Sequence, residues 1–280
     1  MTFSIDRISS FVNNRPVACL FLILALSFTL RISRCFLVGR VDKDSVIYMA
    51  IADGLLNNDF KQAFELNPRI PPLYIFGIAA GEKLGIGTRI SGMLISVISG
   101  ALLPLALFIA ALKVFRNSKL ALLATLMVTV HPFLIRMSAD IMRDSLFMST
   151  TAFGLAFAVS AATDKRIFSW QWGLSGFFTG LAAMTRSEGV EVFFVVVLWF
   201  GLEALLKIKK MRELKNIIIR AAVSISIFIA VFVATTMPVE YALRGSSSEW
   251  SAMDKRAIGY LDNFFGTRKD VILRGKGEPE

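Results

Sequence analysis

Charged side chains of both signs occur in several short polar segments of this largely apolar chain. The first such segment, VDKDSVIYMAIADG (41–54), follows an apolar run and carries Asp42 and Asp44. A carboxylate can act as a general base or bind a divalent metal, and an arginine can hold a phosphate through two parallel hydrogen bonds. A site that contains both carboxylates and arginines would suit the transfer of a chemical group from an anionic donor. The residues concerned are Arg31, Arg34, Asp42, Asp44, Arg69, His131, Arg136, Asp140, Arg143, Asp144, Arg186, Glu188 and Glu191.

The composition predicts a protein that crosses a membrane several times. Of 280 residues, 55% are hydrophobic and 19% are charged, and the mean hydropathy is +0.63. Apolar runs near 20 residues match the length needed to span a hydrocarbon core of roughly 30 Å. The net charge of +10 does not indicate nucleic-acid binding, because the Lys and Arg residues gather in short loops between the apolar runs. We therefore expect an all-α integral membrane protein.

Seven apolar segments are predicted to form transmembrane helices. Cys19 and Cys35 lie 16 residues apart in the first of them, which is roughly 24 Å along a helix and too far for a disulfide. An odd number of spans would put the N-terminus and the C-terminal tail on opposite sides of the membrane. The predicted segments are 16–37, 90–112, 120–135, 145–163, 167–185, 189–206 and 217–237.

The basic residues predict how these helices are oriented. Lys and Arg are enriched in cytoplasmic loops of membrane proteins. Here the basic segments alternate onto one side, which we expect to be cytoplasmic: the N-terminal segment, KVFRNSK (113–119), TDKR (163–166) and KIKKMRELKN (207–216). The extracytoplasmic side would then receive residues 38–89, 131–144, 185–189 and the tail.

The first extracytoplasmic loop, residues 38–89, is predicted to contain two interfacial helices. An apolar stripe at helical spacing predicts the first of these helices, which would lie in the plane of the membrane surface. The proline pair of PPLYIFGIAAGEKLG (71–85) suits the start of a second helix that is too short to span. The stripe consists of Tyr48, Ile51, Ala52, Leu55 and Leu56.

Several of the charged residues also have a purely structural explanation. Asp44 and Asp144 could each cap the N-terminus of a helix. Arg31 and Arg34 could extend to the lipid headgroups. Local ion pairs could form between Asp140 and its arginine neighbours along a helix, and His131 could simply end one. The small residues of GFFTG (176–180) are explained by close helix packing.

Four sequence segments carry a resemblance to a known group of enzymes. They are DSVIYMAIA (44–52), PPLYIF (71–76), HPFLIRMSADIMRDSLF (131–147) and GLSGFFTGLAAMTRSEG (173–189). In order and spacing, they resemble the polyprenyl-phosphate-sugar-dependent glycosyltransferases of the GT-C superfamily, in particular the branch related to dolichyl-phosphate-mannose protein mannosyltransferases. The resemblance covers about residues 10 to 210. It implies an α-helical membrane fold with an extracytoplasmic active site.

The resemblance also implies roles for individual residues. Asp44 matches the catalytic aspartate of the family's first loop, which would take the proton from the acceptor as it attacks the anomeric carbon with inversion. Arg186 matches the arginine of the family's T-R-x-E run and would hold the donor phosphate. Asp140 and Asp144 both fit the acidic position of the second loop, and their spacing does not choose between them. Further substrate-binding residues are expected to be Arg143, Tyr48, Glu188 and Arg69.

The chain departs from the family pattern in three places. Ser45 follows the aspartate, where many relatives have glutamate. Ile70 precedes the proline pair, where some relatives have a basic residue, and Arg69 stands one step earlier. The chain also ends soon after the seventh span, where relatives continue. We therefore expect residues 1–240 to form one membrane module and residues 241–280 to form an extracytoplasmic tail that begins a missing C-terminal region.

These observations predict a membrane glycosyltransferase that moves a sugar from a polyprenyl-phosphate donor to a protein, lipid or glycan acceptor outside the cytoplasm. Two other classes stay open, a transporter or flippase-like protein and a non-catalytic, truncated membrane protein. The enzyme is favoured because the charged residues gather at one face, whereas transporters place them near the middle of the bilayer. A divalent metal is the one cofactor that the carboxylates suggest, and the sequence does not decide whether it is required. The expected partners are the donor, the acceptor and the bilayer, and not nucleic acid.

Overall fold

The computed structural model describes residues 15–38, 41–57, 70–164, 166, 168–206 and 214–246. The all-α prediction is confirmed, because every regular element in these ranges is a helix. The helices are α2 (Pro16–Val38), α3 (Lys43–Leu56), α5 (Leu73–Lys83), α6 (Thr88–Phe115), α7 (Ser118–Thr129), α8 (Pro132–Ala139), α9 (Asp144–Thr163), α10 (Gln171–Thr185), α11 (Gly189–Leu206) and α12 (Leu214–Ser246).

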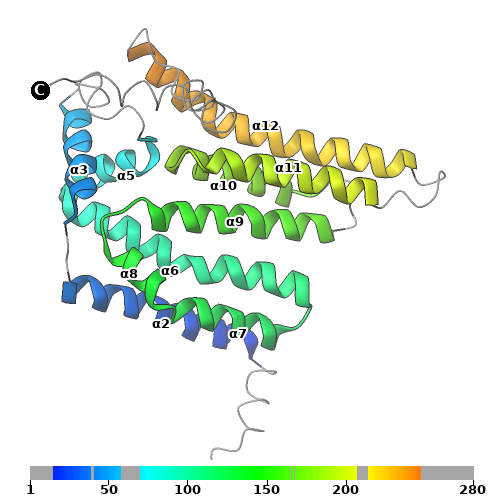
Figure 1. Cartoon of the computed structure of the whole chain (residues 1–280), viewed down its shortest axis with the longest axis horizontal. Coiled ribbons are helices and arrows are strands. Elements are labelled where there is room, and N and C mark those ends of the chain that lie inside the picture. The colour runs from blue at the N-terminus through cyan, green and yellow to red at the C-terminus, as the bar shows by residue number, and fades with distance from the viewer. Residues whose placement is uncertain are drawn as a thin grey trace, which may run out of the picture.

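The long helices run side by side, and α3 lies across one end of them (Figure 1). Helix α6 packs on α2 and α7 on one side and on α9 on the other, while α10 lies between α9 and α12. Helix α5 packs against both α3 and α6. As a result, helices α3 and α5, the α8–α9 loop and the α10–α11 turn all meet at the same end of the bundle (Figure 1).

Four of these helices are long and apolar enough to cross a membrane. They are found at 16–37, 88–115, 144–163 and 218–239, and a fifth span is present if α7 and α8 count as one. The prediction of a single continuous helix over 120–135 is wrong, because α7 and α8 meet at an angle of 55°. Pro132, at the first position of α8, explains the break, since its ring fits a helix start but not a helix interior. The fifth predicted helix begins at Gln171 rather than at residue 167.

Small residues let α10 approach its neighbours closely. A Cβ atom on Gly176 would collide with the backbone of Phe228 in α12. On the other side of α10, the Ser175 hydroxyl donates a hydrogen bond of 2.8 Å to the carbonyl of Gly154 in α9. The close packing expected for residues 176–180 is thus present, and it fixes the position of the α10–α11 turn that follows.

The two helices of the first loop pack together in a hydrophobic cluster that also includes Ile141 of the α8–α9 loop. Tyr48, Ile51, Ala52 and Leu55 of the predicted apolar stripe are all buried and Leu56 is partly buried, and they pack with buried residues of α5. The rings of Tyr48 and Tyr74 meet edge to face with their centres 5.5 Å apart. A side chain such as Ile51 contributes about 1.5–3 kcal/mol when it is fully buried. The cluster therefore holds α3 in a defined position across the bundle end.

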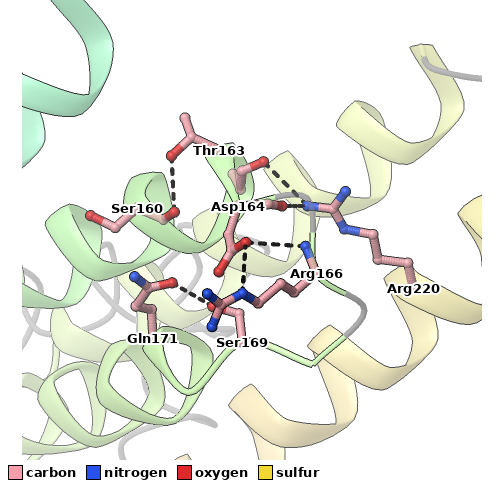
Figure 2. Close-up of polar contacts among 8 residues, drawn as sticks. Ser160, Thr163, Asp164, Arg166, Ser169, Gln171 and Arg220 are labelled. Carbon is pink, nitrogen blue, oxygen red and sulfur yellow. Dashed lines mark hydrogen bonds and ion pairs between the residues drawn. The ribbon is translucent and has the colours of Figure 1, made fainter. Parts of the chain in front are cut away.

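The opposite end of the bundle is fixed by Arg220 of α12, which Figure 2 shows reaching the end of α9. Its guanidinium donates hydrogen bonds to the carbonyls of Ala162 and Asp164. Carbonyls at a helix C-terminus lack partners within the helix and carry partial negative charge, so a cation is favourable there. The Asp164 carboxylate in turn accepts from the backbone N–H of Arg166 at 3.1 Å.

Candidate active site

The candidate site lies where α3, the α8–α9 loop and the α10–α11 turn converge, with Tyr48 between them. Its side chain is only 3% exposed, and the guanidinium carbon of Arg143 lies 5.9 Å from the centre of its ring. Burial raises the pKa of the Tyr48 hydroxyl, and the charges of Arg143, Asp44, Asp144 and Arg186 also act on it. Residues that are up to 142 positions apart along the chain therefore share one electrostatic environment.

Asp44 lies in the first turn of α3 and is exposed. The helix-capping explanation for Asp44 is wrong, because the N-cap residue is Asp42. The Asp42 backbone N–H donates to the hydroxyl of Ser45 at 3.2 Å, which completes the cap. Among the described residues, Asp44 makes no hydrogen bond or ion pair. In the part of the chain that the structure describes, nothing occupies this carboxylate.

Ser45, which stands where many relatives of the proposed type have glutamate, is buried, whereas Asp44 is exposed. The Ser45 hydroxyl donates a hydrogen bond of 3.1 Å to the carbonyl of Ile141 in the α8–α9 loop. The same loop is held from α6, where the Ser96 hydroxyl donates to the carbonyl of Met142 at 3.0 Å and bonds the Tyr74 hydroxyl at 3.0 Å. Serine side chains thus fix the backbone just before Arg143.

Arg186 pairs with two carboxylates at the end of α10. One is Asp144, at the start of α9, and the other is Glu188, at 2.6 Å. Hydrogen bonding to Glu188, followed by the charge of Asp144, raises the pKa of Arg186 against the effect of burial. The same contact lowers the pKa of Glu188. A Cβ atom on Gly189 would collide with the backbone of Ala183, so glycine is needed for the tight turn that presents these side chains.

Arg143 is placed differently from Arg186. Among the described residues it has no ion pair, and its Nη1 is buried without a hydrogen-bond partner. The Nε of Arg186 is also buried without a partner in the same part of the chain. A buried N–H without a partner is costly, which makes such groups candidates for binding an acceptor oxygen of a ligand. Arg143 and Arg186 thus each keep one guanidinium nitrogen without a hydrogen bond among the described residues.

The structure separates the two acids that the sequence could not distinguish. Asp144 pairs with Arg186, whereas Asp140, which ends α8, acts electrostatically on the thiol of Cys35 in α2. Arg69 lies outside the described residues. Within those residues, no group of three His, Cys, Asp or Glu side chains is placed to hold a metal. Ser96 and Tyr74 were not predicted as part of the site, because each of them is an ordinary member of an apolar helix in the sequence.

The sequence pattern of the family described as dolichyl-phosphate-mannose-protein mannosyltransferase matches residues 69–236, which is more than half of the chain. The chain belongs to this family. It is therefore a membrane glycosyltransferase of the GT-C kind, and the family implies a polyprenyl-phosphate-linked sugar donor. No curated protein matches the sequence individually.

The match to the mannosyltransferase family covers most of the candidate site but not all of it. The matched range includes Arg143, Asp144, Arg186 and Glu188, whereas Asp44 precedes it. Asp44 thus enters the site through the packing of α3 on α5 and through the Ser45 hydrogen bond to the α8–α9 loop.

Proposed function

We propose that this mannosyltransferase-family protein transfers a sugar from a polyprenyl-phosphate donor to an acceptor hydroxyl, with inversion at the anomeric carbon. The single observation that carries the proposal is that the exposed carboxylate of Asp44, which has no ion pair among the described residues, and the guanidinium groups of Arg143 and Arg186 all act on the same buried side chain, Tyr48. A base and an anion-binding pair are the two functions that this reaction needs.

In the proposed reaction, Asp44 accepts the proton of the acceptor hydroxyl as its oxygen bonds to the anomeric carbon. The bond between that carbon and the phosphate oxygen breaks, and polyprenyl phosphate leaves with the electron pair. The developing charge on the phosphate is held by Arg143 and Arg186, which makes it a better leaving group. Asp144 is a poorer candidate for the base, because it is already paired with Arg186.

We further propose that the site faces the extracytoplasmic side. The basic segments 113–119 and 163–166 belong to the other end of the bundle, and basic loops are enriched on the cytoplasmic side. A donor whose lipid lies in the outer leaflet would then bring its phosphate to the level of the α10–α11 turn.

The test is transfer from a radiolabelled polyprenyl-phosphate mannose in membranes that contain the full chain. Asp44→Asn should lower kcat by about 10²- to 10⁴-fold, which is the usual contribution of a positioned general base. Asp42→Asn is the matched control, because asparagine also caps helices and the change removes the same charge two residues away. Equal transfer by wild type and Asp44→Asn would remove Asp44 from the mechanism.

A further inference from the structure

Arg31, in the membrane-spanning helix α2, is the largest completely buried side chain in the part of the chain that the structure describes. Arginine stays charged in proteins, and a charge within a bilayer is costly unless it is paired or serves a purpose. Among the described residues, no carboxylate forms an ion pair with Arg31. Arg31 is therefore not part of a buried salt bridge among the described residues. Because its side chain is completely buried, it does not extend to the lipid headgroups either.

The hydrogen bonds of Arg31 join α2 to the broken pair α7 and α8. Nη1 donates to the Ser27 hydroxyl at 2.7 Å and to the carbonyl of Thr129 at 3.4 Å. Thr129 is the last residue of α7, so its carbonyl has no partner within that helix and lies at the negative end of the helix dipole. The guanidinium thus satisfies backbone that the 55° bend leaves open inside the membrane.

A second set of contacts leads from Arg31 toward the candidate site. Its Nε donates to the Ser138 hydroxyl at 3.3 Å, in the last turn of α8. The same hydroxyl accepts a hydrogen bond of 3.3 Å from Ser145, which follows Asp144 in the first turn of α9. Gly100 of α6 leaves the room for this junction, because a Cβ there would collide with the side chain of Ser138.

Two observations separate this junction from simple helix packing. Nη2 of Arg31 and the hydroxyl of Thr129 are both buried without hydrogen-bond partners in the described part of the chain. The protein therefore keeps a cation here although that cation is incompletely satisfied, and an apolar side chain of similar size would avoid this cost. The presence of the Arg31 guanidinium is explained if its hydrogen bonds hold a neighbouring segment that must be placed accurately.

We propose that Arg31 is a positioning residue that sets Asp144, and through it Arg186, by holding the α8–α9 loop against α2. This inference rests on the proposed function for its effect on transfer, but its structural part can be tested separately. Arg31 does not touch the donor in this proposal. It acts through Ser138 and Ser145, and a displacement of about 1 Å at a site of this kind can cost a factor of about 10² in rate.

The variants are Arg31→Met, which keeps the bulk of the side chain but removes the hydrogen bonds, and Ser138→Ala, which removes only the link. Both should lower kcat/KM for the radiolabelled donor by about tenfold or more per folded protein, with the amount of folded protein measured by thermal unfolding in detergent. The double variant should be little worse than either single variant, because both interrupt the same chain of contacts. Arg34→Met is the control, since Arg34 lies in the same helix and makes no hydrogen bond among the described residues.

A structural readout is provided by Cys35, which is buried and donates to the carbonyl of Ala139 at 3.5 Å, one residue beyond Ser138. In a Cys19→Ala background it is the sole thiol, and Arg31→Met should raise its rate of maleimide labelling in native membranes about tenfold by loosening α8 from α2. If the wild-type protein transfers no sugar, the proposed function fails. The rate of Cys35 labelling alone then tests whether Arg31 holds α8 against α2. Unchanged labelling would overturn the proposal. The proposal would also be overturned if kcat/KM for the donor stayed within twofold of wild type, or if the effects of the two substitutions were additive in the double variant. It would be overturned as well if the loss of activity only followed the amount of folded protein.

Discussion

The guanidinium of Arg143 lies over the ring of Tyr48, with 5.9 Å between its central carbon and the ring centre. Arg186, by contrast, is paired with two carboxylates, those of Asp144 and Glu188. An aromatic face orients a cation without neutralising it, whereas two carboxylates more than balance one guanidinium. Of the two arginines, Arg143 therefore presents the less compensated positive charge to an anionic donor.

The ring of Tyr48 should matter more than its hydroxyl. Tyr48→Leu removes the aromatic face under Arg143, which is worth about 0.5–2 kcal/mol, so we expect the KM for the donor to rise roughly 2- to 30-fold. Tyr48→Phe keeps the ring and should leave the KM within about twofold. Initial rates at varied donor concentration measure both values. A larger effect of Tyr48→Phe than of Tyr48→Leu would show that the hydroxyl, and not the face, is used.

The two acids of the α8–α9 loop should behave differently. Asp144→Asn removes a charged partner of Arg186 and should lower kcat/KM for the donor at least about tenfold, since hydrogen bonds to charged groups contribute about 1.5–3 kcal/mol. Asp140→Asn alters a group on the side of the loop that faces α2 and should lower kcat/KM for the donor by less than about threefold. Transfer assays on the two variants side by side check the difference. The reverse ranking would place the functional acid at Asp140.

The ion pair between Arg186 and Glu188 should make stability depend on acid pH. Arg186 lowers the pKa of Glu188 in the folded protein. The pair is therefore fully stabilising above the unfolded pKa of a glutamate, about 4.3, and this stabilisation is lost as the pH falls through the lower, folded pKa. The difference in unfolding temperature between wild type and Glu188→Gln should stay constant from pH 7 to about pH 5 and shrink below about pH 4. A difference that instead grows with falling pH would contradict this assignment.

The turn between α10 and α11 should tolerate no side chain at Gly189. A Cβ atom there would collide with the backbone of Ala182 and Ala183, and overpacking of this kind costs about 1–3 kcal/mol. Gly189→Ala should lower the thermal unfolding temperature and, by displacing Arg186, weaken donor binding. Gly201→Ala is the matched control, because a Cβ in that helix would meet nothing within 4 Å. Thermal unfolding in detergent compares the two.

The sequence predicted the bounds of the helices, and the gathering of charged segments at one end of them, better than it predicted the contacts between side chains. Apolar runs and basic loops are strong signals because unpaired backbone groups and charges cost free energy inside a bilayer. Helices α2, α6 and α9 accordingly fall close to their expected bounds. The bend at residues 130–131 was missed because HPFLIRMSA reads as continuous apolar helix unless Pro132 is taken as a new helix start.

The finer features of the site could not be predicted, because they depend on contacts between distant segments. Asp42 and Asp44 are equally plausible caps by type, and the choice is made by Ser45, whose hydroxyl also bonds Ile141, 96 residues away. Asp140 and Asp144 are one helical turn apart in sequence, but the loop between α8 and α9 directs them to different neighbours. Local patterns carry no information about such long-range pairings.

The two faces of α3 differ in a way that bears on what can reach the site. Ser45 and Tyr48 anchor one face against the rest of the molecule, while Asp44 stands on the open face. An acceptor would thus approach sideways, from the water layer over the membrane, without threading between helices.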